Sequence, residues 1–321
     1  MKKFLALVLA VSMLLALAAC GKKDPTPTPD DQQNPDTESE YPVMTIRLAH
    51  DAPLTTPHHE AAEKIKAALE EKSGGKITVE VYPNQQFGSA SEMIESQQMN
   101  TVEMVLLPTS KYGGFYPTLN IMDMPFLFPT QESTMKLFKS ELATEMMAGL
   151  EDIGIHGLAF YSSGSRNFTN NYEIHKPEDF KGLRIRTQEA PIIMEMYKSW
   201  GATTTAIDIM ELYNALQNKT VDGQENPFLS IANLKLYEVQ KYMTISKHAY
   251  LSYVLTFSDA FLNGLPEDLE QIVMDCGKEC VQYHRDQMAE LNQGYYDNIA
   301  ASGAKTVACG CPACMMQLSN M

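Results

Sequence analysis

The sequence predicts an α/β protein whose folded part forms two lobes. Two kinds of segment follow one another along nearly all of residues 43–321. In one kind, apolar and polar side chains alternate, as in half-buried strands; in the other, apolar side chains recur at helical spacing. A part of this length with no dominating repeat is longer than most single domains, so we expect two lobes. Binding sites then tend to lie between lobes and beyond the carboxyl ends of strands.

The composition excludes several classes of protein. Of the 321 residues, 44% are hydrophobic, which is too many for an intrinsically disordered chain. Lys and Arg number 25 against 40 Asp and Glu, and this net charge of −15 argues against a nucleic-acid partner, because phosphate contacts need clustered basic side chains. The longest apolar run, residues 4–19 with Ser12 inside it, is shorter than the roughly 20 residues that span a bilayer, which excludes a polytopic membrane protein.

The N-terminus has the layout of a secretory leader. Lys2 and Lys3 precede the apolar run, and the sequence Leu-Ala-Ala-Cys-Gly that ends it resembles the bacterial lipobox. We therefore predict a signal peptide at residues 1–19 and a lipid on Cys20 that anchors the chain to the bacterial cell membrane, with a plain signal peptide and an incidental Cys as the alternative. Residues 20–42, rich in Pro and polar side chains, predict an extended tether without a core.

The folded part opens with a strand, a helix and a second strand. Residues 44–50 and 77–82 alternate apolar and polar side chains. Between them, Thr56 and Pro57 suit the N-cap and first position of a helix, which ends at Ser73 and the two glycines after it. This order predicts two parallel strands joined by a helix.

Later elements follow from the same patterns. Asp208 with Glu211 three residues later indicates a capping box at a helix start, and Pro266 opens a long helix whose apolar residues keep helical spacing from Leu269 to Leu291. The remaining expected strands are residues 102–107, which suit a buried parallel strand, 154–161, 182–187 and 251–257, and the remaining expected helices are residues 91–100, 191–200 and 209–218.

Motifs of enzymes and metal sites are mostly absent from the sequence. It contains no G-x-S-x-G, no G-x-G-x-x-G and no phosphate-binding loop, and His59-Glu60-Ala61-Ala62-Glu63 lacks the second His of a zinc protease helix. We therefore predict no catalysis, no metal and no cofactor. The cysteines other than Cys20 are Cys276, Cys280, Cys309, Cys311 and Cys314. They could be free thiols or pair oxidatively, and the last three could also bind a soft metal.

The expected strand at residues 182–187 carries two arginines. If Leu183 and Ile185 face the core, Arg184 and Arg186 share the opposite face, and Arg186 falls at the carboxyl end, where open sheets bind ligands. A guanidinium there could hold a carboxylate by two parallel hydrogen bonds. A surface ion pair is the alternative role for such an arginine.

Several long segments resemble the DctP-type solute-binding receptors of TRAP transporters, in the family's order from about Met44 to Gly303. These segments are R-N-F-T-N at residues 166–170, K-P-E-D-F-K-G-L-R-I-R at 176–186, G-A at 201–202, E-L-Y-N-A-L-Q at 211–217 and V-D-G-Q-E-N-P at 221–227, with support from E-K-S-G-G-K at 71–76, Q-F-G-S at 86–89 and P-F at 125–126.

The resemblance implies a fold like that of periplasmic binding proteins, with a long helix spanning both lobes. Lobe I would comprise residues 43–164 plus about 253–292, and lobe II residues 165–252 plus about 293–321. The family usually continues past Gly303 with a further strand and helices, whereas this chain has a Cys-rich stretch there, so we expect a truncation or a change of reading frame at the C-terminal end of lobe II.

The resemblance also implies an extracytoplasmic receptor. It would capture a small organic acid, such as a mono- or dicarboxylate or a sugar acid, and deliver it to the TRAP membrane subunits. The alternatives are a binding protein for an ABC importer or a sensor kinase, and a surface enzyme that acts on an acidic metabolite.

Ligand contacts follow from the resemblance residue by residue. Arg186 would be the principal carboxylate clamp and Arg166 a second arginine near the ligand. Asn226 would be a ligand contact, with an N-cap before Pro227 as its alternative role. Less specific pocket candidates are His50, Thr109 and Ile209, of which His50 could equally be a histidine with satisfied hydrogen bonds at the cleft edge.

Overall fold

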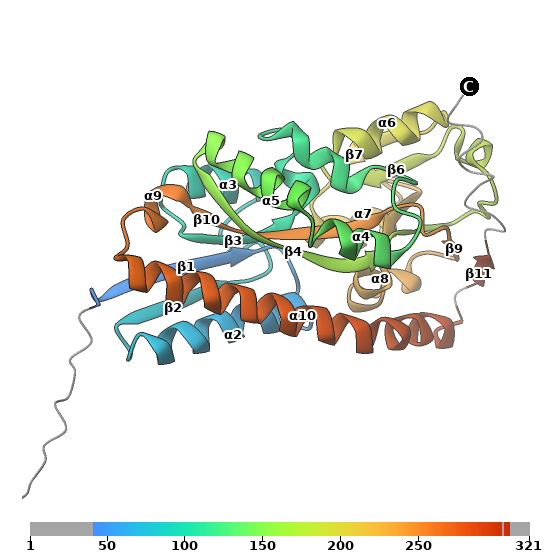
Figure 1. Ribbon diagram of the computed structural model, residues 1–321. Helices are drawn as coiled ribbons and strands as arrows, with labels where there is room; N and C mark the ends of the chain where they lie inside the picture. The colour runs from blue at the N-terminus through green and yellow to red at the C-terminus, as the bar shows by residue number, and fades with distance from the viewer. Residues whose placement is uncertain (1–40, 304, 309–321) are drawn as a thin grey trace, which may run out of the picture. The chain divides into compact units, whose positions relative to one another are not determined.

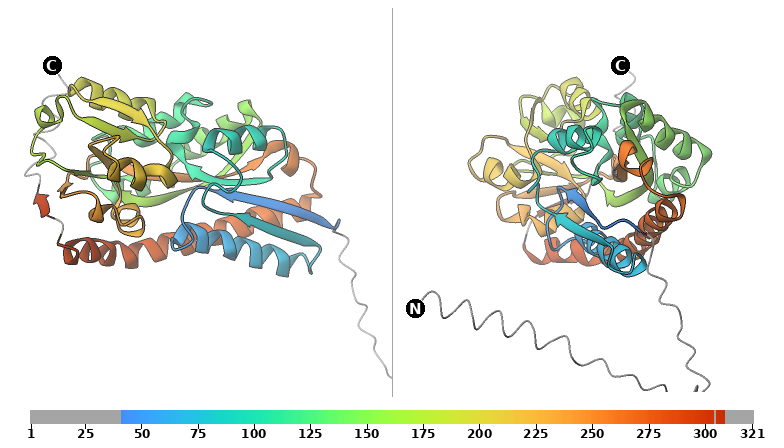
Figure 2. Two further views of the ribbon diagram at one scale, coloured as in Figure 1. Left: turned by 180° about the vertical axis from the view of Figure 1, so that it is seen from behind. Right: turned by 90° about the vertical axis from the view of Figure 1, so that its left-hand side faces the viewer.

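The computed structural model, shown in Figures 1 and 2, describes residues 41–303 and 305–308. The chain divides after Glu38, and all described residues belong to the unit Ser39–Met321. The signal peptide, Cys20 and most of the tether lie outside the described residues, as do Cys309, Cys311 and Cys314, so these predictions stay predictions. None of the described helices is long and apolar enough to cross a membrane.

The first lobe is built on a five-stranded sheet of order β2-β1-β3-β10-β4. β1 pairs in parallel with β2 and β3, which confirms the parallel arrangement expected for the opening strands, whereas β10 is antiparallel to β3 and β4. The strands are β1 (Met44–His50), β2 (Ile77–Tyr82), β3 (Met104–Pro108), β4 (Ile155–Ser165) and β10 (Tyr250–Ser258).

Both faces of this sheet are covered. Alternate side chains of β3 enter different cores, since Met104 and Leu106 belong to one and Val105 and Leu107 to the other. Strand β3 is buried at all five positions, as expected. Helices α2 (Pro57–Lys72) and α10 (Glu267–Ala301) contribute to the first core, and α3 (Ala90–Gln98) and α5 (Glu141–Ala148) to the second; α4 (Gln131–Leu137) and α9 (Asp259–Leu262) are the remaining helices of this lobe.

Helix α2 begins as predicted. Thr56 has an extended backbone, its side chain accepts a hydrogen bond from the N–H of His59 at 3.5 Å, and Pro57 is the first helical residue. The helix ends at Lys72 with Ser73 as its C-cap. Helix α3 starts with a full capping box between Ser89 and Glu92, which satisfies two backbone N–H groups at once.

The second lobe is built on a six-stranded sheet of order β11-β9-β5-β8-β6-β7, with its own two cores. Of these strands the sequence patterns predicted β6 alone. All six have only four residues, too few to show a clear alternation, but the apolar Leu183 and Ile185 between Lys181, Arg184 and Arg186 made the alternation visible at β6. The strands are β5 (Asn167–Asn170), β6 (Arg184–Thr187), β7 (Thr203–Ala206), β8 (Gly223–Asn226), β9 (Tyr242–Ile245) and β11 (Lys305–Ala308), and the helices are α6 (Pro191–Ser199), α7 (Leu212–Gln217) and α8 (Phe228–Asn233).

The helix expected at residues 209–218 differs at its start. Ile209–Glu211 forms a 3-10 turn, and α7 follows from Leu212 to Gln217. The predicted capping box is wrong, because the side chain of Asp208 makes no capping hydrogen bond. Its Oδ1 atom lies instead 3.7 Å from Nζ of Lys111, which belongs to the first lobe. A contact between lobes has thus replaced a local one.

Three stretches of the described chain connect the two sheets. β4 ends at Ser165 and β5 begins at Asn167, so Arg166 is the residue at which the chain crosses from one sheet to the other. The second crossover runs between β9 and β10, and the backbone N–H of Arg166 donates to the carbonyl oxygen of Ala249 there at 2.8 Å. The first two crossovers therefore lie side by side.

The third connection is α10, which has 35 residues and is about 52 Å long at 1.5 Å per residue. Leu269, Val273 and Cys276 pack into a core of the first lobe, while Ile299 packs into a core of the second. Figures 1 and 2 show the helix running beneath both sheets. The expected long helix that spans both lobes is confirmed.

Three buried histidines of the first lobe have unusual acid–base properties. Burial lowers the pKa of His50 and of His284 to about 3, and it lowers the pKa of His58 well below the usual value. The rings of His58 and His284 lie 4.4 Å apart between centroids, so a proton on one would disfavour a proton on the other. All three are therefore neutral in the folded protein at neutral pH.

We expect the free energy of unfolding to fall as the pH falls below 6.5. The unfolded chain then binds protons that the folded chain excludes, and each such histidine costs about 1.4 kcal/mol per pH unit until its folded pKa is reached. Asp51 acts in the opposite direction, because burial raises its pKa to about 6. Urea unfolding at pH 7.5 and 5.5 measures the net effect.

The variant His284→Leu should flatten this pH dependence, because it removes a histidine that burial keeps neutral in the folded chain. Neither ring nitrogen of His284 has a hydrogen-bond partner among the described residues, so the substitution breaks no hydrogen bond of the ring. An unaltered slope in His284→Leu would contradict the assignment.

Candidate functional site

A cavity lies between the two lobes, with an empty volume of about 490 Å³ that is partly open to solvent. Its first-lobe wall comes from the residues after β1, from the start of α2, from the end of β3, from the first residues of the antiparallel strand β10 and from Lys111. Its second-lobe wall comes from the end of β6 with Gln188, from Ile209 and from α8 with Asn226 before it. The cavity therefore sits at carboxyl ends of strands, as expected for an open α/β sheet.

Arg186 brings a buried positive charge to this cavity. Its side chain is 1% exposed, and its Nε–H donates to the carbonyl oxygen of Ile207 at 2.8 Å. Among the described residues no carboxylate lies within ion-pair distance, and the Nη2 atom has no hydrogen-bond partner. Burial, together with the charge of Arg166, lowers the pKa to about 10, so the guanidinium is still charged at neutral pH.

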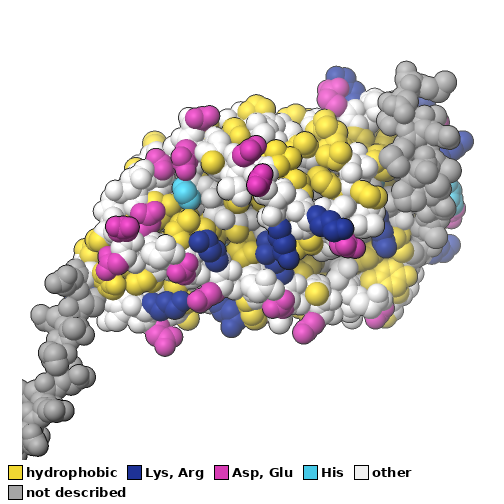
Figure 3. All heavy atoms as spheres, viewed as in Figure 1, with side chains coloured by type: hydrophobic (Ala, Val, Ile, Leu, Met, Phe, Trp, Pro, Cys, Tyr) yellow, Lys and Arg dark blue, Asp and Glu magenta, His cyan; other side chains and the backbone are white. Residues whose placement is uncertain are grey.

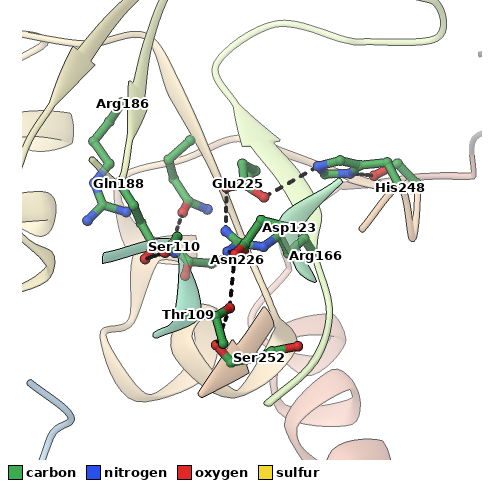
Figure 4. A network of polar contacts seen from close by, with 12 residues as sticks. Thr109, Ser110, Asp123, Arg166, Arg186, Gln188, Glu225, Asn226, His248 and Ser252 are labelled. Atoms are coloured by element: carbon green, nitrogen blue, oxygen red, sulfur yellow. Dashed lines mark hydrogen bonds and ion pairs between the residues drawn. The ribbon is translucent and has the colours of Figure 1, made fainter. Parts of the chain in front are cut away.

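The neighbouring arginine on β6 behaves differently. Arg184 is exposed, and its guanidinium forms hydrogen bonds to both carboxylate oxygens of Asp222 at 3.1 and 2.7 Å. The alternative role considered for such an arginine, a surface ion pair, therefore describes Arg184. Arg186 instead points into the space between the lobes (Figure 4), where a charge without a partner is costly.

Arg166 is equally buried, but its charge is compensated. At 0% exposure, it donates to Oε1 of Glu225 at 2.6 Å and to Oδ1 of Asp123 at 2.7 Å. Figure 4 shows these contacts, together with Thr109, which donates to Oδ2 of Asp123 at 2.9 Å, and His248, whose Nε2 lies 3.3 Å from Oε2 of Glu225. Arg166 thus links a carboxylate of each lobe at the crossover.

The pKa shifts in this network follow from burial and pairing. Burial alone would lower the pKa of Arg166, but Glu225 and Asp123 raise it above its usual value. Burial raises the pKa of Asp123, which Arg166 and Thr109 offset only in part. The pKa of Glu225 is lowered, because Arg166 and His248 outweigh its burial. Arg166 is therefore a charged group that is already neutralised by protein carboxylates.

Gln188 connects this network to the first lobe. With the amide oriented so that both of its ends have partners, it donates to Oγ of Ser110 at 2.8 Å and accepts from both terminal nitrogens of Arg166 at 3.0 and 3.1 Å. Because Gln188 also lines the cavity, the cavity wall and the crossover are held together by one side chain.

Three of the six candidate ligand contacts line the cavity, namely Arg186, Asn226 and Ile209. The alternative role of Asn226 as an N-cap is wrong, since the N-cap of α8 is Pro227 and the amide of Asn226 donates to Gln224. The other three, Arg166, Thr109 and His50, lie outside the lining.

His50 fits its alternative role as a satisfied histidine. Its Nδ1 accepts from the backbone N–H of Ala52 at 3.2 Å, which places the ring proton on Nε2, and Nε2 lies 3.2 Å from Nδ1 of His59. Thr109 orients Asp123, as described above. Both side chains support the walls of the site from behind.

Among the residues of the cavity lining that sequence reasoning missed are Asp51, Lys111 and Tyr253. Asp51 directly follows His50 at the end of β1, and Lys111 comes two residues after Thr109. Considering every polar residue just beyond a strand end, rather than one for each strand, could have found these two. Tyr253 lies inside β10, and no sequence signal marks it.

The cleft is closed in this structure, because polar contacts bridge it. Besides Ser110 with Gln188, these are Lys111 with Asp208 at 3.7 Å, Thr55 with Asn233 at 2.9 Å and Ser91 with Glu189 at 3.4 Å.

No group of side chains in the described residues is arranged to hold a metal ion. Cys276 and Cys280 are buried free thiols in α10, and burial raises the pKa of both. Of the alternatives for these two cysteines, the structure shows the free-thiol form.

The fold and the cavity between lobes define a solute-binding protein of the periplasmic type. A family model described as "Bacterial extracellular solute-binding protein, family 7", the DctP family, matches residues 48–310. The chain therefore belongs to the DctP family, and it is a solute-binding protein of the TRAP type.

Relatives and solved structures agree with this assignment. The C4-dicarboxylate-binding periplasmic protein DctP of Rhodobacter capsulatus is 31% identical over 78% of this chain and 75% of its own. A TRAP periplasmic solute-binding protein from Shewanella oneidensis with bound succinate superposes with a TM-score of 0.83 at 28% identity, covering 87% of this chain and 91% of its own. Another such protein, from a Bradyrhizobium species and in complex with D-galacturonate, superposes with a TM-score of 0.81 at 27% identity, covering 86% of this chain and 94% of its own.

The variant Arg166→Met should lower the free energy of unfolding by about 3–5 kcal/mol, because it leaves two buried carboxylates without their cation. Arg184→Met, which removes an arginine from an exposed ion pair, is the matched control and should cost about 1 kcal/mol or less. Urea unfolding at pH 7.5 measures both. Equal losses in the two variants would show that the Arg166 network does not stabilise the fold.

Proposed function

We propose that this protein is the extracytoplasmic receptor of a TRAP-type secondary transporter and that it captures a small organic carboxylate between its lobes. The observation that carries the proposal is Arg186, a buried guanidinium at the cavity with no carboxylate partner among the described residues. A ligand carboxylate would supply that partner by two parallel hydrogen bonds in a site largely shielded from water. The solved neighbours that bind succinate, L-malate and D-galacturonate support this ligand class.

In this proposal the two buried arginines have different roles. Arg186 holds the ligand carboxylate, with Asn226 beside it in the cavity wall. Arg166 positions the site, because both of its terminal nitrogens are already bonded to protein carboxylates. Ligand binding then raises the population of the closed form only by its preference for that form, and the two crossovers with α10 are the places where the lobes can hinge.

The proposed lobe boundaries are residues 43–164 plus about 253–292, and residues 165–252 plus about 293–321. The chain changes sheet at Arg166, which supports the first inner boundary. It changes again between β9 and β10, and because β10 begins at Tyr250, this change lies a few residues before the proposed boundary at 252/253. Along α10, the switch from one lobe's core to the other's lies between Val281 and Tyr295, which supports a boundary near residue 292.

Delivery to TRAP membrane subunits and lipid attachment at Cys20 are further parts of the proposal. The family match supports a TRAP partner over an ABC importer, a sensor kinase or a surface enzyme acting on an acidic metabolite. A nucleic-acid partner is not part of it, because acidic and basic side chains are interspersed on the face drawn in Figure 3, without a broad basic surface.

The variant Arg186→Met should abolish or strongly weaken acid binding. Loss of one partner of a buried, hydrogen-bonded charge pair costs about 2–5 kcal/mol, a factor of roughly 30 to several thousand in Kd. Titration calorimetry with succinate, L-malate and D-galacturonate measures the effect. The fold should stay intact, because Arg186 leaves no protein carboxylate behind when it is removed.

Arg184→Met is the matched control, since Arg184 lies two residues away on the same strand but is exposed and paired with Asp222. Its Kd should equal that of the wild type. Unchanged affinity in Arg186→Met would reject the carboxylate clamp.

The variant Cys20→Ser should move the protein from the membrane fraction to the soluble fraction of a bacterial host. The thiol of Cys20 is the proposed point of acylation, and a buried acyl chain contributes about 0.8 kcal/mol per CH₂ to membrane binding. Labelling of the host with a radioactive fatty acid, followed by fractionation, measures both the lipid attachment and the location of the protein. Membrane retention of Cys20→Ser without label in either form would show that the anchor is not a lipid on this residue.

A further inference from the structure

Asp51 brings a buried carboxylate into the same cavity as Arg186. It follows the last residue of β1, is 3% exposed and lines the cavity. The hydroxyl of Tyr253 donates to its Oδ1 at 3.2 Å, and among the described residues no further side chain donates to this carboxylate. Asp51 therefore has hydrogen-bonding capacity left over at the cavity wall.

The charged groups around the cavity partly balance one another before any ligand enters. Lys111 lines the cavity, lies 3.7 Å from Asp208 and interacts electrostatically with Asp51. Arg186 is the second cation. Glu225, Asp208 and Asp51 also interact electrostatically with Arg186, but among the described residues none of them lies within ion-pair distance of its guanidinium.

This balance accommodates one ligand carboxylate more readily than two. The first would meet Arg186. A second would have to share Lys111 with Asp208 and Asp51, and it would bring a like charge close to a buried carboxylate.

Asp51 is ionised under ordinary assay conditions. Burial raises its pKa to about 6, while Lys111 and the hydrogen bond from Tyr253 pull it down, so the carboxylate predominates at pH 7.5. An ionised carboxylate accepts hydrogen bonds and donates none. The ligand group that meets Asp51 must therefore be a donor, such as a hydroxyl.

We propose that the cavity selects an organic monocarboxylate that carries hydroxyl groups, with its carboxylate on Arg186 and a distal hydroxyl donating to Asp51, and that it discriminates against dicarboxylates. This inference rests on the proposed function, because it takes Arg186 as the carboxylate clamp.

Six-carbon acids that differ only in their functional groups test the inference. Gluconate and galacturonate carry one carboxylate and several hydroxyls, adipate carries a second carboxylate, and hexanoate carries neither addition. Calorimetry at pH 7.5 should show the wild type binding one of the hydroxylated acids roughly tenfold or more tighter than adipate and hexanoate, since a hydrogen bond to a charged acceptor has about that effect.

The variant Asp51→Asn keeps the size of the side chain and removes its charge. It should reduce the preference for the hydroxylated acid over adipate by roughly tenfold, through weaker binding of the former and tighter binding of the latter. Asp152→Asn removes an equivalent charge from the surface and should leave the preference unchanged. Tyr253→Phe removes the hydroxyl that holds Asp51 and should shift the preference in the same direction by a smaller factor.

The outcomes separate this inference from the proposed function. The receptor function stands if acids bind the wild type and Arg186→Met abolishes this binding. In that case the proposed selection by Asp51 is wrong if adipate binds tightest, or if Asp51→Asn and Tyr253→Phe both leave the preference unchanged. If none of these acids, and neither succinate nor L-malate, binds the wild type, the proposed function fails and this inference fails with it.

Discussion

The ion pairs that Arg166 makes with Asp123 and Glu225 are the constraint on which the rest of the structure depends. Arg166 sits where the chain passes from the five-stranded to the six-stranded sheet, and each lobe supplies one of its two carboxylates. Buried charges of this kind are tolerated only while they are paired, so the geometry of the crossover is held within narrow limits. Gln188 extends the same constraint to the cavity wall.

The contrast between two buried arginines connects this architecture to function. Arg166 and Arg186 are similarly buried, yet one is neutralised by protein carboxylates and the other is not. The guanidinium of Arg166 is paired with carboxylates of both lobes, whereas that of Arg186 has no carboxylate within ion-pair distance among the described residues. A protein with a net charge of −15 can therefore attract an anion through one local cation, because burial makes that cation's environment differ from the acidic surface.

Where the patterns were long or chemically specific, the sequence predicted the fold well. The opening β1, α2 and β2 were located with their boundaries, because alternation over six or seven residues and the Thr56-Pro57 helix start are local signals. The second sheet's strands other than β6 were missed, since their pairing depends on neighbours distant in sequence. The prediction at Asp208 failed for the same reason: its side chain lies near Lys111 across the cleft and does not cap the helix that its local sequence predicts.

By itself, the sequence determined the α/β class, the long helix α10, the family and the position of Arg186 at a strand end, because each of these depends on local periodicity or on a contiguous motif. Only the tertiary structure decided which arginine is free and which is neutralised, that His50 and Thr109 support the site from behind, and that Asp51 and Lys111 face the ligand space. Those properties depend on which side chains from distant segments meet at the closed cleft, and an electrostatic environment is a sum over spatial neighbours that no local pattern records.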